Sequence, residues 1–476
     1  MKLNLKVLAI LACVALLLPF IVVGVVTFAL PPQYTQTFLG ELSEKYDRLN
    51  SIDEPKIVII GGSSVAFGLD CAMIEEYTGM PAVNFGLYAS LGTKAMIDLS
   101  KSNINEGDIV ILAPEMDAQT LSLFFNEESM WQAMDGHFGM LKNIGAANRG
   151  AMFGGVWGFA ADKFDFWKAG AAPNPEGVYN KSSFNEYGDI VYEREYNIMA
   201  LGYDPTTVID LSPSIVDKEF IDYVNDYIAW CEKKGAQVYF SFSPMDNMAL
   251  KEGTTDESIY TFFSYMAAHL DCEIISDIND CIMDWEYFYD TNFHLNDAGV
   301  KVHTAALIED IRRAMSNTEA LVIELPEKPT RPDVYVDASQ NDTTGFFVIE
   351  SIDNVMTLTG ITDLGKQQST LTLPLAMDGL AVQTVAAGAF AGCDLLEEII
   401  IEADTNLSLM NNNAFEGAAN LKRITIRCMP DDILVGNGLM DGAADGVKIF
   451  VPRDYYGDYA AHYFWSEFMS YISISG

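Results

Sequence analysis

Basic residues and cysteines are both scarce in this chain, and each shortage excludes a class of function. Only 28 of the 476 residues are Lys or Arg against 67 Asp or Glu, so the formal net charge is −39. This charge repels phosphate backbones, and we therefore expect no nucleic acid partner. The seven cysteines are scattered, and no two stand at the two-residue spacing of zinc or redox motifs, which argues against a structural metal and a disulfide framework.

The chain also lacks the short motifs that bind nucleotides or catalytic zinc. It contains no P-loop, no Gly-x-Gly-x-x-Gly after a predicted strand and no His-Glu-x-x-His. We therefore predict no cofactor and no metal. Hydrophobic residues make up 50% of the chain and charged residues 20%, which favours a folded protein over a disordered one. The length favours more than one domain, because a single core rarely serves a chain of this size.

The N-terminus carries one long apolar run without charge. From Val7 to Leu30 there are 24 residues, and as a helix they rise about 36 Å, more than the roughly 30 Å hydrocarbon core of a bilayer. The run is longer than the apolar part of a cleaved signal peptide, which is the alternative. We predict a transmembrane signal anchor over 1–31. Lys2 and Lys6 precede the run, so the bulk of the chain is expected outside the cytoplasm.

A short amphipathic stem over 32–55 is followed by alternating strand and helix patterns. The first predicted strands are the apolar runs at 56–60, 82–85 and 108–112. Such continuous runs are typical of parallel strands that are buried on both faces. Right-handed crossovers then favour a three-layer α/β/α sandwich with a mainly parallel sheet, which we place at 56–320. An insertion at about 118–210 lacks clean periodicity and is expected to roof a substrate cleft.

A linker at 321–335 is predicted because three of its prolines fall within seven residues. The domain that follows, 336–476, contains a repeat. The sequence Ala-Phe-Ala-Gly-Cys at 389–393 recurs 25 residues later as Ala-Phe-Glu-Gly-Ala at 414–418, and in degraded form after another 25 at 439–443. Each copy precedes a short alternating strand, so we predict a stack of short units closed by end caps.

This repeat resembles the leucine-rich repeats of bacterial surface proteins, over roughly 370–452. The resemblance implies one short strand and one turn per unit, with the Phe or Met of each turn in a shared core. It also implies a face that binds a protein or glycan ligand.

A serine pair follows the first predicted strand, and an acid and a histidine precede the last predicted helix. Gly62, Ser63 and Ser64 stand at the carboxyl end of that strand, where active sites of open α/β sheets lie. Asp290 and His294 stand in a loop, where a carboxylate can orient an imidazole to accept a serine proton. The alternative is structural, since a Gly-Ser turn or a single buried histidine carries no chemistry by itself.

These residues resemble the conserved blocks of the SGNH (GDSL-type) serine hydrolases. The third residue of the first block is the nucleophile, and the resemblance assigns this role to Ser64. The second block matches Gly86, whose N–H, with that of Ser64, implies an oxyanion hole. The last block matches Asp290 and His294 as the acid and the base of a catalytic triad.

Two departures from the family pattern bear on activity. The third block usually has an asparagine that completes the oxyanion hole, but here the third strand leads into Ala-Pro-Glu-Met-Asp at 113–117 and this donor is missing. Asp290 and His294 are also four residues apart where three is usual. Similar departures occur in divergent SGNH-like proteins that move acyl groups on cell-envelope polymers. The resemblance implies an extracytoplasmic, membrane-anchored serine esterase or O-acyltransferase acting on glycans or envelope polymers. The alternative is a catalytically silent surface adhesion or scaffold protein that binds protein or glycan through its repeats.

Overall fold

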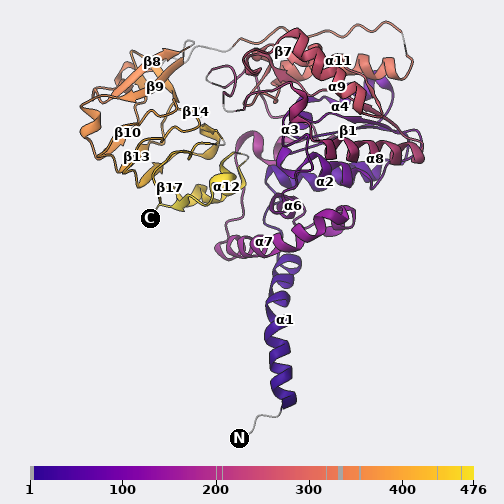
Figure 1. Cartoon of the computed structure of the whole chain (residues 1–476), viewed down its shortest axis with the longest axis horizontal. Coiled ribbons are helices and arrows are strands. Elements are labelled where there is room, and N and C mark those ends of the chain that lie inside the picture. The colour runs from indigo at the N-terminus through magenta and orange to yellow at the C-terminus, as the bar shows by residue number, and fades with distance from the viewer. Residues whose placement is uncertain are drawn as a thin grey trace.

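An α/β domain, a smaller β-rich domain and a projecting N-terminal helix make up the structure (Figure 1). The computed structural model describes residues 5–199, 201–205, 207–317, 319–330, 336–352, 355–436, 438–462 and 464–475. Of the predicted linker at 321–335, residues 331–335 lie outside this description. The six cysteines whose side chains are described are all free.

Five parallel strands in the order β2-β1-β3-β4-β6 form the central sheet of the α/β domain. They are β1 (Ile57–Gly61), β2 (Ala82–Gly86), β3 (Ile109–Leu112), β4 (Gln237–Phe240) and β6 (Glu273–Ile274). Every residue of the three strands β1, β2 and β3 is buried, as expected for a sheet covered on both faces. The predicted α/β class with a parallel sheet is confirmed.

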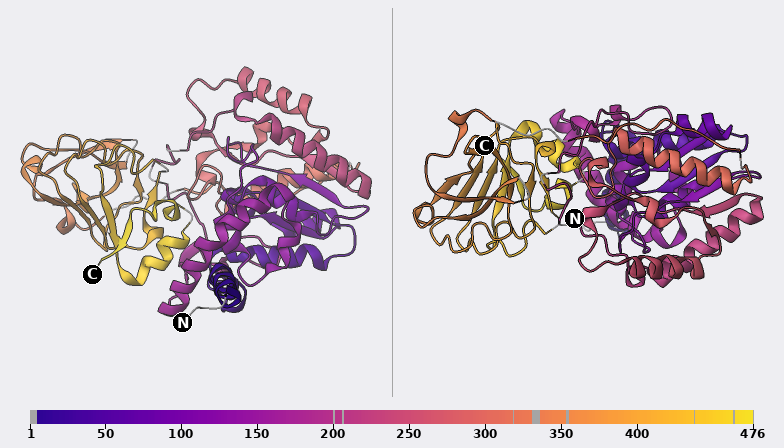
Figure 2. Two further views of the ribbon diagram at one scale, coloured as in Figure 1. Left: turned by 60° about the horizontal axis from the view of Figure 1, so that its bottom comes forward. Right: turned by 90° about the horizontal axis from the view of Figure 1, so that it is seen from above.

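Helices cover both faces of this sheet (Figure 2). Side chains alternate along each strand, so Val58 and Ile60 enter one core while Ile57 and Ile59 enter the other. The first core is covered by α2 (Leu42–Ser51), α5 (Thr93–Ser100), α8 (Lys218–Lys234) and α9 (Asp256–His269). The second core is covered by α4 (Cys71–Thr78) and α11 (Asp297–Ala314). The carboxyl ends of the strands remain free to carry a site.

Residues 32–55, predicted as a stem, instead form part of the first helical layer. Leu42 and Leu49 of α2 are fully buried in the first core. Lys45 is buried as well, and its Nζ donates to the backbone oxygen of Asn84 at 3.2 Å. The segment is therefore packed against β2 rather than standing apart from the domain.

The N-terminal segment forms α1 (Leu5–Ala29), a helix that contains Pro19. Among the residues that the structure describes, no helix combines the length and the apolar character needed to cross a bilayer. The transmembrane helix predicted over 1–31 is therefore not supported, and residues 1–4 of that segment lie outside the description.

The insertion expected at 118–210 is integrated with the first core. It carries α6 (Glu127–Ala133), which buries Met130 and Trp131, and α7 (Arg149–Ala169). Figure 1 shows α7 lying across the inner end of α1, below the α/β domain.

The β-rich domain stacks parallel strands at the spacing of the sequence repeat. In β13 (Glu398–Ile401), β15 (Arg423–Ile426) and β17 (Lys448–Val451), the residues Ile399, Ile424 and Ile449 stand opposite one another. This sheet has the order β10-β13-β15-β17-β18, with outer strands β10 (Thr370–Thr372) and β18 (Ile472–Ile474). A second sheet holds β9 (Val355–Ile361), β12 (Leu380–Val385), β14 (Leu409–Met410) and β16 (Leu434–Val435). Residues that are 25 positions apart in the sequence thus stand opposite one another in neighbouring strands of this sheet.

Both ends of this stack are covered. At one end β8 (Phe347–Ile352) pairs antiparallel with β9. At the other end lie α12 (Tyr456–Ala461) and the 3-10 helix η14 (Trp465–Phe468), with Tyr459 and Trp465 fully buried. The repeat aromatics fill the middle, where Phe390 and Phe415 stack with ring centroids 5.8 Å apart.

This stacking predicts a large cost for removing one repeat aromatic. We expect Phe415→Ala to lower the free energy of unfolding by about 3–5 kcal/mol, because the cavity it leaves lies between two packed units. Leu395→Ala is the control, since Leu395 is 58% exposed and should change stability by less than about 0.5 kcal/mol. Urea unfolding followed by circular dichroism measures both, and equal stabilities would contradict the shared core.

Candidate active site

Asp290 and His294 form a buried pair at the carboxyl edge of the central sheet. His294 Nδ1 and Asp290 Oδ1 are 2.8 Å apart, and both side chains are almost completely buried. An ionised carboxylate can only accept, so a hydrogen bond to Asp290 is donated by Nδ1 of the ring. Phe67 lies flat against the imidazole, with ring centroids 3.8 Å apart and planes 4° apart. The spacing of four residues between Asp290 and His294 therefore allows their side chains to be in hydrogen-bond contact.

The loop that carries this pair is closed by its own backbone. The Tyr289 N–H donates to the carbonyl of His294 at 2.8 Å, and Phe288 and Leu295 form an antiparallel bridge. Asn296 caps α11 by accepting from the N–H of Gly299 at 3.0 Å. A fixed loop before a capped helix holds the imidazole in one orientation.

The serine pair begins α3 (Ser63–Gly68), directly after β1, and its two members are placed differently. Ser63 lines a cavity of about 370 Å³ together with His294 and Glu115. Ser64 is fully buried, and its N–H donates to Glu115 Oε1 at 2.8 Å. The Ser63 hydroxyl also reaches Glu115 Oε1, at 3.3 Å.

Both backbone donors expected in an oxyanion hole already have acceptors. The Ser64 N–H is bound by Glu115, and the Gly86 N–H donates to Asn84 Oδ1 at 3.2 Å. Asn84 is itself fixed, because its amide donates to the backbone oxygen of Val65 at 2.9 Å. These two N–H groups therefore stand beside the serines without being free to receive a negatively charged oxygen.

Glu115 is the buried acid beside the serine pair. It follows β3 and is 3% exposed, and a Cβ placed on Gly62 would lie 2.2 Å from its Oε2. Oε2 is buried without a hydrogen-bond partner. Burial raises the pKa of Glu115, so the neutral acid persists to higher pH than in an exposed glutamic acid. A neutral Glu115 is a hydrogen-bond donor that lines the cavity.

The cavity beside Ser63 is shared between the two domains. Its wall includes Tyr88 and Thr291 from the α/β domain, and Phe464 and Glu467 from the end cap of the repeat domain. A neighbouring cavity of about 540 Å³ also borders Tyr88 and Glu467. The repeat domain therefore contributes part of the wall of this cavity.

Two residues that hold the Asp–His loop were not indicated by the sequence. The Tyr179 hydroxyl, from the insertion, donates to Asp290 Oδ2 at 2.5 Å. The amide of Asn292 donates to the carbonyls of Asp204 at 2.8 Å and Thr207 at 2.6 Å. Tyr179 stands 111 residues from Asp290, and no local pattern marks such a pairing. Asn292 lies inside the last block itself, where its neighbours could have drawn attention to it.

Metal ligation has no support in the described residues, where no group of three or more His, Cys, Asp or Glu side chains is placed to hold an ion. Comparisons with family models, with curated proteins and with solved structures find no match to this chain. The role of each side chain therefore follows from its own contacts.

Proposed function

We propose that the protein is a serine esterase or O-acyltransferase with Ser63 as the nucleophile, His294 as the base and Asp290 as the residue that orients it. One observation carries this proposal: Ser63 and the buried, acid-paired His294 line the same cavity. The resemblance to SGNH hydrolases assigns the nucleophile to Ser64. We prefer Ser63 because Ser64 is not among the residues that line the cavity.

The proposed reaction proceeds in two steps. The Ser63 hydroxyl attacks the carbonyl carbon of an ester, its proton passes to His294 Nε2, and the alcohol leaves with that proton. Water or an acceptor hydroxyl then attacks the acyl-serine, gives its proton to His294 and releases Ser63. Polar side chains around the cavity, including Gln119 and Asn292, suit a hydroxylated substrate. We therefore retain the acyl groups of glycans or envelope polymers as the substrate class.

Within this mechanism we assign Glu115 as the missing oxyanion donor. Its buried Oε2 has no partner, and it stands beside Gly62, next to the nucleophile. In the neutral form Oε2 carries a proton that it can donate to the developing oxyanion, while Oε1 accepts from Ser64. A buried carboxylic acid that stays neutral is a known way to supply such a donor.

The nucleophile is tested by labelling the full chain with a fluorophosphonate probe. Ser63→Ala is expected to abolish labelling and to lower p-nitrophenyl acetate turnover by about 10⁴-fold or more. Ser64→Ala is the matched control and should still be labelled, since it removes a neighbouring hydroxyl of the same kind. Labelling that survives in Ser63→Ala but disappears in Ser64→Ala would return the nucleophile to Ser64.

The role of Glu115 is tested by its dependence on pH. Glu115→Gln keeps a donor and should retain turnover within about 10-fold, whereas Glu115→Ala should lose about 10²- to 10³-fold. In the unaltered protein the rate should fall at high pH as Glu115 loses its proton, and this fall should be absent in Glu115→Gln. If Gln proves as damaging as Ala, Glu115 acts through its charge and the donor role is wrong.

The hydrogen bonds already made by the expected oxyanion donors favour a second candidate function, a catalytically silent scaffold. The N–H groups of Ser64 and Gly86 already have acceptors. On this reading the repeat domain binds a protein or glycan ligand and the α/β domain only supports it. The same probe separates the two functions, because a silent domain would leave the unaltered protein unlabelled.

The location is proposed from the sequence alone. Lys2 and Lys6 before the apolar N-terminal run favour an extracytoplasmic α/β domain attached to a membrane through that run. Protease added to intact cells should then cleave the α/β domain, and cleavage seen only after lysis would contradict this orientation.

A further inference from the structure

Helix α7 has two faces of different character. One face is buried under the α/β domain through Met152, Phe159 and Lys163. The other face exposes four large aromatic side chains. They are Phe153 (64% exposed), Trp157 (37%), Phe164 (40%) and Trp167 (45%).

These four aromatic residues form one stripe, which we call the aromatic face. At about 100° per residue, their positions fall within about 80° of arc around the helix axis. Phe164 and Trp167 also contact each other, with ring centroids 5.8 Å apart. A helix with such a stripe of exposed aromatic side chains has an apolar surface that water does not favour.

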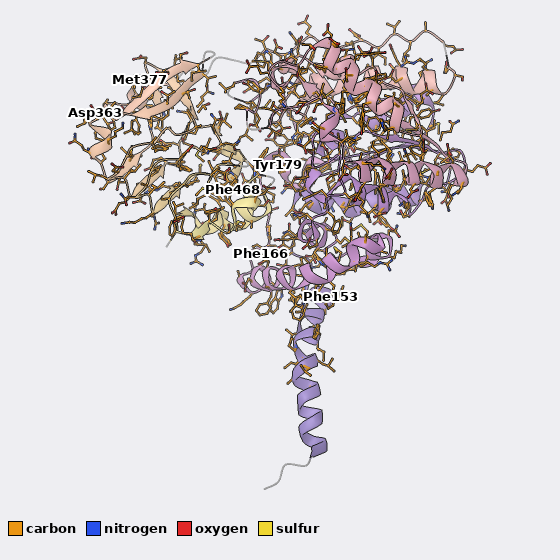
Figure 3. All side chains as sticks on the ribbon, viewed as in Figure 1. Phe153, Phe166, Tyr179, Asp363, Met377 and Phe468 are labelled. Atoms are coloured by element: carbon orange, nitrogen blue, oxygen red, sulfur yellow. The ribbon has the colours of Figure 1, made fainter. Side chains whose placement is uncertain are left out.

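The aromatic face continues onto the exposed surface of α1. Phe20 of α1 contacts Trp157 with ring centroids 5.1 Å apart, and Phe153 with centroids 6.4 Å apart. Among residues 14–29 of α1, whose side chains the structure describes, nine large apolar side chains are at least 50% exposed. Figure 3 places Phe153 on the side of α7 that meets α1, away from the α/β domain. The two helices thus present a continuous apolar surface.

A buried lysine side chain links these helices. Lys163 of α7 donates to Asp135 Oδ1 at 2.7 Å and to the backbone oxygen of Thr27 of α1 at 2.9 Å. Both side chains of the pair are fully buried, so the contact resists water and salt. The aromatic face is therefore held in one orientation relative to α1.

We propose that the aromatic face of α7 lies in the headgroup region of a lipid bilayer, with the α/β domain above it. Trp and Phe side chains favour this depth, because their rings are apolar while the interface remains partly wet. Arg149 and Lys168, exposed near the two ends of α7, can reach lipid phosphates. With a net charge of −39 the protein suits a zwitterionic surface better than an anionic one. The proposal concerns contact with the surface and requires no crossing helix.

This placement would also bring the candidate site near the lipid surface, a point that rests on the proposed function. Asp162 and Asp165 of α7 border the cavity of about 540 Å³. That cavity shares Tyr88, Ser90 and Glu467 with the cavity that Ser63 lines. A polymer held at the membrane surface then has a route along α7 to Ser63.

The test uses tryptophan quenching in the full chain reconstituted in nanodiscs. The discs contain phosphatidylcholine brominated near the carbonyl end of one acyl chain, with unbrominated phosphatidylcholine as reference. Bromine quenches indoles that lie within the bilayer interface, so the unaltered protein should lose fluorescence. Trp157→Phe with Trp167→Phe should remove most of this quenching while leaving the apolar surface in place.

Trp230→Phe is the matched control, because Trp230 lies on α8 and packs against the first core of the α/β domain. This variant should be quenched like the unaltered protein. If the Trp157→Phe, Trp167→Phe variant is quenched as strongly as the unaltered protein, the aromatic face does not touch lipid. If quenching is absent and sedimentation shows dimers that disappear when all four aromatic residues are changed to Ser, a second copy of the chain covers the face instead. Both outcomes overturn the proposal, and neither depends on esterase activity.

Discussion

The contact between His294 and Asp290 is the interaction on which the candidate site depends. It is buried, it is held by the backbone of its own loop, and Tyr179 secures the second carboxylate oxygen. A buried acid next to an imidazole is stable only when its oxygens have partners, and both oxygens do here. The parallel sheet then supplies the rest, because all its strands end at the same edge and so deliver the serines and Glu115 to one place.

Glu115 is a buried carboxyl group beside the serine pair. Its Oε1 accepts from the N–H of Ser64. Burial raises the pKa of Glu115 and so favours the neutral acid. Its Oε2 has no hydrogen-bond partner and, when protonated, can donate a hydrogen bond.

The repeat domain and α7 give the site its surroundings. Phe464 and Glu467 of the end cap close one side of the cavity, so both domains line it. Below it, Lys163 of α7 pairs with Asp135 and also donates to the backbone oxygen of Thr27, which joins α7 to the N-terminal helix. The cavity of about 540 Å³ lies between α7 and the end cap.

The sequence by itself determined the parallel α/β domain, the repeat register and the local pairing of Asp290 with His294. Each of these depends on short-range patterns: apolar runs for buried strands, a fixed period for stacked units, and a spacing of four residues within one loop. Only the tertiary structure decided which serine lines the cavity, where the N–H groups of Ser64 and Gly86 point, and that residues 32–55 belong to the core. Tyr179 and Phe464 also reached the site only through folding. Such contacts join residues far apart in the chain, and their geometry depends on how whole elements pack rather than on any local pattern.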